Sequence, residues 1–278
     1  MGRSVVTLMS RNPFSDLDRP PLSETALRRG LGHGASLWND VSVVRESAST
    51  NADVAAAARA GAAEGLVVVA EAQTAGRGRL DRSWSSPPRA GLTFSALLRP
   101  TFPPAGWGWI PLLCGVSVAG PLSRLAGLDV RLKWPNDVLV GERKLGGILT
   151  EVVDSGVVVG IGLNVSLRED EIPVPTATSL AIEGSELVDR DPVLRVVLRE
   201  LARWYTVLSE AGGDAEAAGL RSAYREASAT LGRVVQVQLP DQQVLSGEAI
   251  DVDGQGRLVV RDATGDHAVG AGDVVHVR

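Results

Sequence analysis

The sequence predicts an α+β protein, with a mixed β-sheet that carries helices mainly on one face and a small β-barrel at the C-terminal end. Three observations support this prediction. Short strand patterns dominate residues 41–165, a long helical pattern begins at Pro192, and short alternating strands fill the chain beyond Leu231. With 278 residues and 44% hydrophobic content, the chain can bury at least one sizeable core, and its length alone allows one or two domains.

Residues 1–36 predict an N-terminal arm rather than a domain. They contain several prolines and glycines and little apolar periodicity, so we expect at most one short helix there, from Ser23 to Arg29, and little apolar burial. Such an arm is shorter than the roughly 60 residues of a DNA-binding winged helix. The rest of the chain divides into a main domain at 37–228 and a C-terminal domain at 229–278.

The main domain begins with alternating strands and helices. Hydroxyl and amide residues at 47–51 suit a helix N-cap, and the alanine-rich run after them predicts a helix to Ala63, ended by Gly65. A second helix is expected over 107–125. Apolar and β-branched runs predict strands at 41–45, 66–72, 92–98, 130–140, 145–153 and 157–165.

Helical periodicity returns after a proline-rich loop. Residues 192–211 repeat apolar side chains at helical spacing, with Asp191 as the expected N-cap and Pro192 at the first helical position, and 215–227 predict a shorter helix. Beyond Leu231 the pattern predicts short strands, which we interpret as a small β-barrel. These strands lie at 234–239, 244–251, 258–261 and 274–277, with turns at 240–241, 253–254 and 264–265.

Composition excludes several classes of protein. Cys114 is the only cysteine, which excludes an intramolecular disulfide and any multi-cysteine metal site and agrees with a reducing cytoplasm. Because the net charge is −5 and the basic residues are spread along the chain, we expect no DNA as a partner. No uninterrupted apolar run reaches the roughly 18 to 20 residues of a membrane-spanning helix, so we expect a soluble protein. Cys114 has apolar neighbours and is expected to be a packed core thiol.

The loop at 73–84 is the first segment that points to chemistry. It alternates glycines with Arg77, Arg79 and Arg82 and ends at Trp84. Glycine allows close backbone approach, so N–H groups can converge on an anion, and guanidinium groups donate paired hydrogen bonds to phosphate or carboxylate. Taken alone, the pattern also fits a mobile, solvated surface loop.

Two further segments place polar or small residues in apolar strands. Lys133, Asn136 and Asp137 interrupt a strand pair that continues with Lys144. If these polar groups are buried without partners, each costs about 2 to 7 kcal/mol of stability, so we expect them to have partners. Alternatively, the segment is the end of a strand that enters a turn, and its lysines lie in solvent. In the segment 160–164, glycines alternate on one strand face and leave room for a thin ligand, a bulge or a closely packed helix.

Together these segments resemble the biotin protein ligase family. The C-terminal strands are similar to the family's SH3-like domain, and the resemblance covers roughly residues 45 to 278. It implies a class II synthetase-like catalytic domain with helices mainly on one face. At Leu80-Asp81 the chain departs from members that have Arg-Gly there. The family motifs occur in order at Ser49-Thr50-Asn51, Gln73 with 76–79 and Trp84, 133–137, 144–148 and 160–164.

The resemblance also implies roles for individual residues. In catalysis it implies Arg77, Lys144 and Asp137, with Asp137 steering the acceptor lysine or a Mg²⁺. The metal ligands themselves stay unassigned. For biotin it implies Ser49, Thr50, Gln73, Gly76, Arg77, Arg79, Lys144, Gly147 and Gly162. For the nucleotide it implies Arg79, Arg82, Trp84, Lys133, Asn136, Lys144 and Asn164.

The implied reaction has two steps. The carboxylate of biotin attacks the α-phosphorus of ATP, with Mg²⁺ present, to give biotinyl-5′-adenylate and pyrophosphate. A lysine amine of a biotin carboxyl carrier domain then attacks this mixed anhydride. The resemblance further implies a cytoplasmic enzyme without DNA or membrane partners, either a monomer or a homodimer promoted by ligand.

Three alternatives stay open at the level of sequence. A lipoate or octanoate ligase or transferase would share the fold, although an octanoyl transferase needs a nucleophilic cysteine in its pocket. A DNA-binding regulator would need a larger N-terminal region. A non-catalytic biotin- or nucleotide-binding module would release no pyrophosphate.

Overall fold

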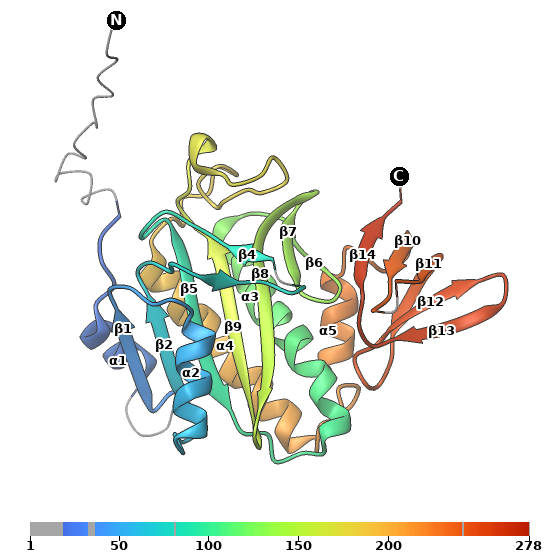
Figure 1. Cartoon of the computed structure of the whole chain (residues 1–278), viewed down its shortest axis with the longest axis horizontal. Coiled ribbons are helices and arrows are strands. Elements are labelled where there is room, and N and C mark those ends of the chain that lie inside the picture. The colour runs from blue at the N-terminus through green and yellow to red at the C-terminus, as the bar shows by residue number, and fades with distance from the viewer. Residues whose placement is uncertain (1–18, 33–36, 81, 241, 278) are drawn as a thin grey trace, which may run out of the picture.

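The computed structural model of the chain describes residues 19–32, 37–80, 82–240 and 242–277. Its main part is a seven-stranded sheet in the order β1-β2-β5-β9-β8-β7-β6 (Figure 1). Strands β1 and β2 are parallel and the other neighbours are antiparallel, so the sheet is mixed, as predicted. The strands are β1 (Asp40–Val44), β2 (Leu66–Ala70), β5 (Gly91–Leu98), β6 (Val130–Lys133), β7 (Asp137–Val140), β8 (Arg143–Val153) and β9 (Gly156–Asn164).

The helices lie mainly on one face of this sheet. Helices α3 (Ile110–Ala126) and α4 (Arg190–Glu210) cover one face, and α5 (Leu220–Ala227) packs beside α3. Helix α2 (Thr50–Arg59) packs alone on the opposite face, in front of the sheet in Figure 1. The predicted fold class is therefore confirmed.

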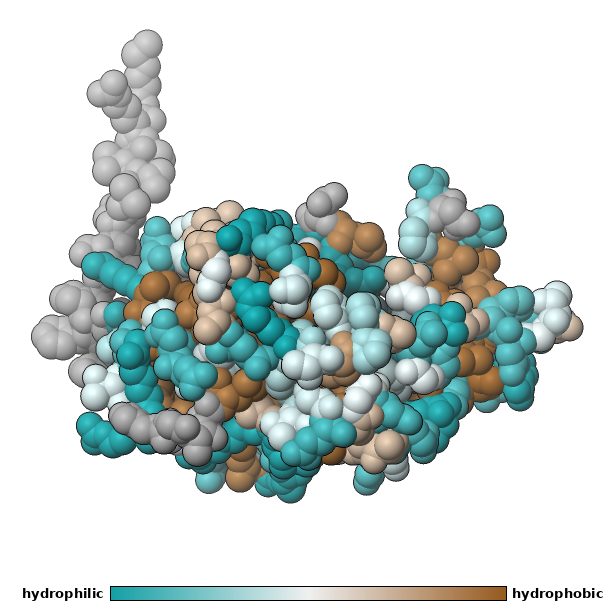
Figure 2. All heavy atoms as spheres, turned by 90° about the horizontal axis from the view of Figure 1, so that it is seen from below, coloured by the Kyte–Doolittle hydropathy of each residue, from teal (hydrophilic) through white to brown (hydrophobic). Residues whose placement is uncertain are grey.

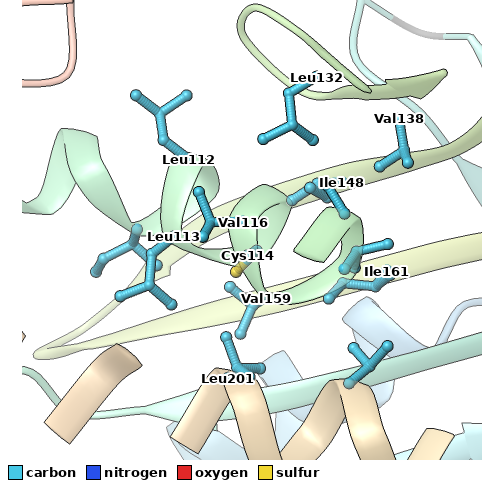
Figure 3. Packing of buried hydrophobic residues seen from close by; sticks show 14 of the residues in the cluster. Leu112, Leu113, Cys114, Val116, Leu132, Val138, Ile148, Val159, Ile161 and Leu201 are labelled. Carbon is cyan, nitrogen blue, oxygen red and sulfur yellow. The ribbon is translucent and has the colours of Figure 1, made fainter. Parts of the chain in front are cut away.

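Side-chain alternation separates the two faces of the sheet. Val159 and Ile161 of β9 point into the core beneath α3 (Figure 3), and period-2 geometry turns Gly160 and Gly162 to the α2 side. The α2 side therefore has small residues where the opposite side has a packed core. This asymmetry leaves space for a ligand beside α2.

Helix α3 is the centre of the core. Leu112, Leu113 and Val116 interdigitate with side chains from the sheet and from α4 (Figure 3). Cys114 is fully buried among them, and burial raises the pKa of its thiol, which confirms the predicted core thiol. The stretch Pro104–Ala126 is long and apolar enough to cross a membrane by length and composition, but 67% of its most apolar window is buried in this core. Its composition is that of a central core helix.

The C-terminal strands form a five-stranded antiparallel sheet in the order β13-β12-β11-β10-β14. Sequence patterns missed β13, a strand of polar and small residues that pairs with β12. The sheet packs on the main domain, and Trp134 Nε1 donates a 3.2 Å hydrogen bond to the Gly256 carbonyl. The strands are β10 (Val234–Gln238), β11 (Val244–Val252), β12 (Leu258–Asp262), β13 (Gly265–Val269) and β14 (Asp273–His276).

Several predicted boundaries are wrong, for identifiable reasons. The single strand predicted at 130–140 is a hairpin of β6 and β7, because Pro135 lacks the N–H that a continuous strand would need. Helix α4 begins two residues early, since Asp189 rather than Asp191 is its N-cap and accepts from Asp191 N. Helices α2 and α5 are shorter than predicted. The glycine- and arginine-rich loop contains a short hairpin of β3 (Gly76–Arg77) and β4 (Ser83–Trp84).

The described part of the N-terminal arm packs on the main domain. The predicted short helix is confirmed as α1 (Glu24–Leu31), capped by Ser23. Leu27 and Leu31 are 0% and 8% exposed and belong to the main core, so the expectation of little apolar burial is wrong here. Leu27 and Leu31 form an apolar stripe on one face of α1, and α1 packs on β1 and α4.

The face of the molecule drawn in Figure 2 mixes hydrophilic and hydrophobic residues across both the main domain and the C-terminal sheet. Such mixing is ordinary for a folded protein, because polar groups are too few to cover a whole surface.

Candidate active site

A pocket opens on the α2 side of the sheet, with a cavity volume of about 120 Å³. Its walls are the start of α2, the β3–β4 hairpin, the starts of β7 and β8, the end of β9 and Asp273 of β14. The predicted residues that it brings together are Ser49, Thr50, Gln73, Arg77, Arg79, Arg82, Trp84, Asn136, Asp137, Lys144, Gly147 and Gly162.

A chain of hydrogen bonds fixes the polar end of this pocket. Gln73 Oε1 accepts from Thr50 N at 2.8 Å and from Thr50 Oγ1 at 3.1 Å. Thr50 Oγ1 also lies 2.7 Å from Ser95 Oγ, and because Ser95 donates its one proton to Asn51 Oδ1 at 2.6 Å, the single Thr50 hydroxyl proton serves either Gln73 or Ser95. Because the Gln73 carbonyl oxygen is used as an acceptor, its Nε2 group is turned to the other side as a donor. Ser49, the α2 N-cap, makes no side-chain capping bond to the described residues.

The chain of bonds continues to the first arginine of the hairpin. Asn51 Nδ2 donates to Glu151 Oε1 at 3.0 Å, and Glu151 pairs with Arg77 at 3.5 Å. Ser95 and Glu151 were not singled out from the sequence. Ser95 lies within an apolar strand, and no local pattern distinguishes a buried serine that orients neighbours from one that only packs.

Glycines form the floor of the pocket. Gly147 of β8 and Gly162 of β9 are register partners, and the Trp84 indole lies over them. A Cβ added at Gly162 would stand 2.6 Å from Trp84 Cε2, so only glycine allows this contact. The structure thus places the aromatic residue expected at the adenine directly against a glycine expected at biotin. Trp84 Nε1 is buried without a partner among the described residues.

Positive charge gathers at the mouth of the pocket. Lys144 Nζ lies 2.5 Å from Asp137 Oδ1. Arg79 donates to Asn136 Oδ1 at 3.2 Å and to the Gly272 carbonyl at 3.1 Å, and burial lowers the pKa of its guanidinium. Arg82 forms an ion pair with Asp273, and this hydrogen bond raises the pKa of Arg82. The C-terminal sheet therefore supplies part of the site.

Three predicted site residues lie outside the pocket wall. Gly76 begins the hairpin, where a Cβ would approach Gln73 Nε2 to 2.8 Å. Lys133 lines a separate small gap beside Pro135. Asn164 is buried and donates through Nδ2 to the Thr178 carbonyl at 2.9 Å. Asn164 therefore holds the loop that follows β9.

Comparisons with known proteins identify the family of the chain. Residues 47–167 match the model of the biotin/lipoate A/B protein ligase family, and residues 230–277 match that of the biotin protein ligase C-terminal domain. The chain is 41% identical over 269 residues to the biotin–[acetyl-CoA-carboxylase] ligase of Mycobacterium tuberculosis, covering 94% of this chain and 97% of that protein. The chain belongs to the biotin protein ligase family.

Other biotin protein ligases are similar over different lengths. The bifunctional ligase/repressor BirA of Escherichia coli is 30% identical over 202 residues, which is 70% of this chain and 61% of that protein. The structure of the biotin protein ligase of Aquifex aeolicus in complex with biotin and ATP superposes with a TM-score of 0.73 at 28% identity. That match covers 86% of this chain and 99% of the Aquifex chain.

Proposed function

We propose that this biotin protein ligase activates biotin with ATP to biotinyl-5′-adenylate and transfers biotin to a lysine of a biotin carboxyl carrier domain. The observation that carries the proposal is one pocket that combines a fixed hydrogen-bonding end, a glycine floor and four cationic side chains. A polar ring, an apolar tail and a carboxylate joined to a phosphate need those features in that order.

The polar end suits the biotin ureido group. With the Gln73 carbonyl held by Thr50, the Gln73 amide donates to the ureido oxygen, and the Ser49 hydroxyl is available as a second partner. Pairing these groups matters, because a desolvated donor or acceptor without a partner costs about 1 to 3 kcal/mol. The Trp84 indole covers Gly147 and Gly162 in this structure, so the apolar ring and tail would lie against these strands only after Trp84 moves toward the adenine.

The cationic mouth suits the reacting groups. Arg77, Arg79 and Lys144 would bring the biotin carboxylate and the α-phosphate together and stabilise the charge that develops on the phosphorus. Arg82 and Asn136 would contact the nucleotide, and Trp84 would pack beside the adenine. Oxygen of the carboxylate forms the new bond to phosphorus, and pyrophosphate leaves.

Transfer follows by attack of the carrier lysine on the anhydride carbonyl. The amine must be neutral to attack, and AMP leaves as the C–O bond breaks. We assign Asp137, at the mouth beside Lys144, to steering this amine. Cys114 takes no part, because it is buried on the other side of the sheet. An acyl-enzyme route of the octanoyl transferase type therefore has no thiol here.

Mg²⁺ accompanies ATP as a substrate partner. The described residues contain no group of three His, Cys, Asp or Glu side chains that could hold a metal, while Asp137 and Asp273 line the pocket. This donor set fits Mg²⁺, which is commonly held by one or two carboxylates together with phosphates and water. When bound, the ion neutralises phosphate charge. Either Asp137 or Asp273 would supply the carboxylate, and Asp137, if it holds the ion, would then not also steer the amine.

We also propose the setting of the enzyme. The catalytic domain would comprise residues 37–228 and the C-terminal domain 229–278, in a cytoplasmic protein that is a monomer or a homodimer promoted by ligand. Neither DNA nor a membrane is needed by this site.

The test is pyrophosphate release by the purified chain with ATP, Mg²⁺ and one acid at a time. Biotin should support release, whereas lipoate and octanoate should not, and addition of a carrier domain should give a stable biotinylated lysine detected by mass spectrometry. If lipoate or octanoate is preferred over biotin, the protein is a lipoate or octanoate ligase and the proposal is wrong. Binding of biotin without pyrophosphate release would indicate a non-catalytic module.

A further inference from the structure

A buried carboxylate outside the pocket joins three distant segments. Glu71, which follows β2, is only 7% exposed. Its Oε2 lies 2.8 Å from Arg190 Nη1 at the start of α4 and 3.8 Å from Arg89 Nε. Its Oε1 accepts a 2.6 Å hydrogen bond from Leu22 N in the N-terminal arm. One side chain is therefore shared by the arm, α4 and the segment before β5.

Both ends of the active-site loop meet at this residue. The loop that carries Gln73 and the β3–β4 hairpin starts directly after Glu71 and returns to the sheet at Arg89. Arg89 N donates to the Glu71 carbonyl at 2.8 Å, so main chain and side chain of Glu71 both bind the returning strand. Glu71, Gln73 and Trp84 also line one small gap. If Glu71 moved, Gln73 and the β3–β4 hairpin would be displaced with it, and both carry residues expected to bind biotin.

The arm extends this attachment to the far end of the loop. Arg190 Nη2 donates to the Pro20 carbonyl at 2.7 Å, and Arg19 Nη2 donates to the Ser166 carbonyl at 2.7 Å. Ser166 N in turn donates to the Ala90 carbonyl at 2.8 Å. Residues 19–22 thus contact the start of the loop directly through Glu71 and its far end indirectly through Ser166.

The chemistry of the cluster favours a role in geometry over a role in stability alone. Buried ion pairs often stabilise a fold no better than apolar residues of similar size, but they fix orientation because each charge needs its partner in place. Glu71 and Arg190 are both buried; their ion pair joins the start of the loop to α4, Arg190 donates to the arm at Pro20, and Glu71 also faces Arg89 at the end of the loop.

We propose that Glu71 is a positioning residue for biotin binding, holding the base of the active-site loop so that Gln73 and Arg77 stand where biotin needs them. This inference rests on the proposed function. Residues 19–22 belong to the same positioning device, because they supply the N–H and carbonyl groups that complete the cluster.

The test compares Glu71→Gln with the wild type. The amide keeps the shape and can still accept from Leu22 N, but it removes the charge that holds Arg190 and Arg89. We expect the KM for biotin to rise about tenfold or more with kcat changed by less than about threefold, since small misplacements of binding groups are costly. Trypsin should cut ligand-free Glu71→Gln faster at Arg77 and Arg79. KM does not depend on the amount of active enzyme, so partial unfolding does not obscure it.

Asp251→Asn is the matched control. Asp251 also pairs with two arginines, Arg221 and Arg225, each at 2.6 Å, but it joins α5 to the C-terminal sheet. We expect this variant to lose thermal stability with an unchanged KM for biotin. Should Glu71→Gln yield no folded protein, Glu71→Asp, which withdraws the charge by one methylene, should still raise the KM about threefold.

The inference is overturned if a folded Glu71 variant melts earlier but keeps the wild-type KM and the wild-type rate of loop cleavage. Failure of the proposed function looks different, because the wild type itself would then release no pyrophosphate with biotin. Loop cleavage by trypsin needs no activity, so it tests the attachment in either case.

Discussion

Lys144 stands at the mouth of the pocket, and its chemistry can be separated from its contribution to the fold. Its side chain is 36% exposed and pairs with Asp137. Exposed pairs of this kind contribute about 0 to 1 kcal/mol to stability. A cation that faces developing phosphate charge contributes far more to the reaction.

Lys144→Ala should therefore reduce adenylate formation by about 10²-fold or more, because it removes a preorganised charge at the phosphate. The melting temperature should stay nearly unchanged. Pyrophosphate release and thermal unfolding measure the two effects. Arg261→Ala, which breaks the exposed Arg261–Asp266 pair on the C-terminal sheet, is the control and should alter neither. Loss of folding in Lys144→Ala would make this residue structural.

Gly162 is a second position where a single substitution tests the binding of biotin. A methyl group there would stand 2.6 to 2.9 Å from three atoms of the Trp84 indole, so Gly162→Ala must displace Trp84 or narrow the floor. Overpacking costs about 1 to 3 kcal/mol, which corresponds to a rise of roughly 5- to 150-fold in the KM for biotin if the cost falls on the biotin-bound form. Steady-state kinetics together with tryptophan fluorescence would detect both changes. Gly254→Ala, where nothing lies within 4 Å of the new methyl group, should behave as wild type.

At the scale of an element, the β3–β4 hairpin is held at both its base and its tip. Its tip reaches the C-terminal sheet through Arg82 and Asp273 and through the bond from Arg79 to the Gly272 carbonyl. From the sequence we expect this loop to be mobile without ligands and ordered by biotin and ATP, because Trp84 is its main apolar anchor. Fixing each residue costs on the order of 1 kcal/mol, so the polar contacts at the tip oppose that cost only in part.

Limited trypsin digestion tests this expectation. Biotin with MgATP should slow cleavage at Arg77, Arg79 and Arg82 by about tenfold, since new charge-assisted bonds then hold the loop. Asp273→Asn should speed cleavage of the free enzyme several-fold, whereas Asp266→Asn, on the same sheet but away from the loop, should not. Identical rates with and without ligands would show that the hairpin is already formed, and the roles of its arginines in binding would lose this support.

Elements with strong local signals were predictable from the sequence. The apolar and β-branched runs of β5, β8 and β9 and the apolar stripe of α4 are signals that the sequence of a single element carries. Boundaries were less predictable where one residue decides them: Pro135 splits the single strand predicted at 130–140, and Asp189 competes with Asp191 as N-cap. Strand β13 could not be predicted, because it is mostly polar and has no apolar alternation.

The residues of the site also divide into those with a local sequence signal and those without one. Residues within ordered motifs, such as Gln73 and Lys144, came together in the pocket as the family resemblance implied. Ser95, Glu151 and Asp273 did not stand out, because their roles depend on partners far away in the chain. Asp273 meets Arg82 across 191 residues, and no local pattern can show such a meeting.

At the scale of the whole molecule, one hydrophobic cluster joins the arm, the main domain and the C-terminal sheet. Leu27 of α1, Trp109 before α3 and Val235 of β10 all belong to it. The candidate pocket lies on the opposite side of the sheet, where α2 forms only a small hydrophobic cluster with the strands. Stability and chemistry are therefore carried by opposite faces of one sheet, which explains how the pocket can be lined by glycines without loss of the core.

Removing the arm should consequently destabilise the enzyme. Deletion of residues 1–35 takes away two buried leucines, each contributing about 1.5 to 3 kcal/mol, from a fold whose total stability is about 5 to 15 kcal/mol. We expect a clear fall in melting temperature by calorimetry and a raised KM for biotin, because Glu71 loses its Leu22 partner. Deletion of residues 1–18 is the matched control, as it keeps Leu22, Leu27 and Leu31 in the chain. A stable and fully active protein lacking 1–35 would show that α1 contributes neither to the stability of the main domain nor to biotin binding.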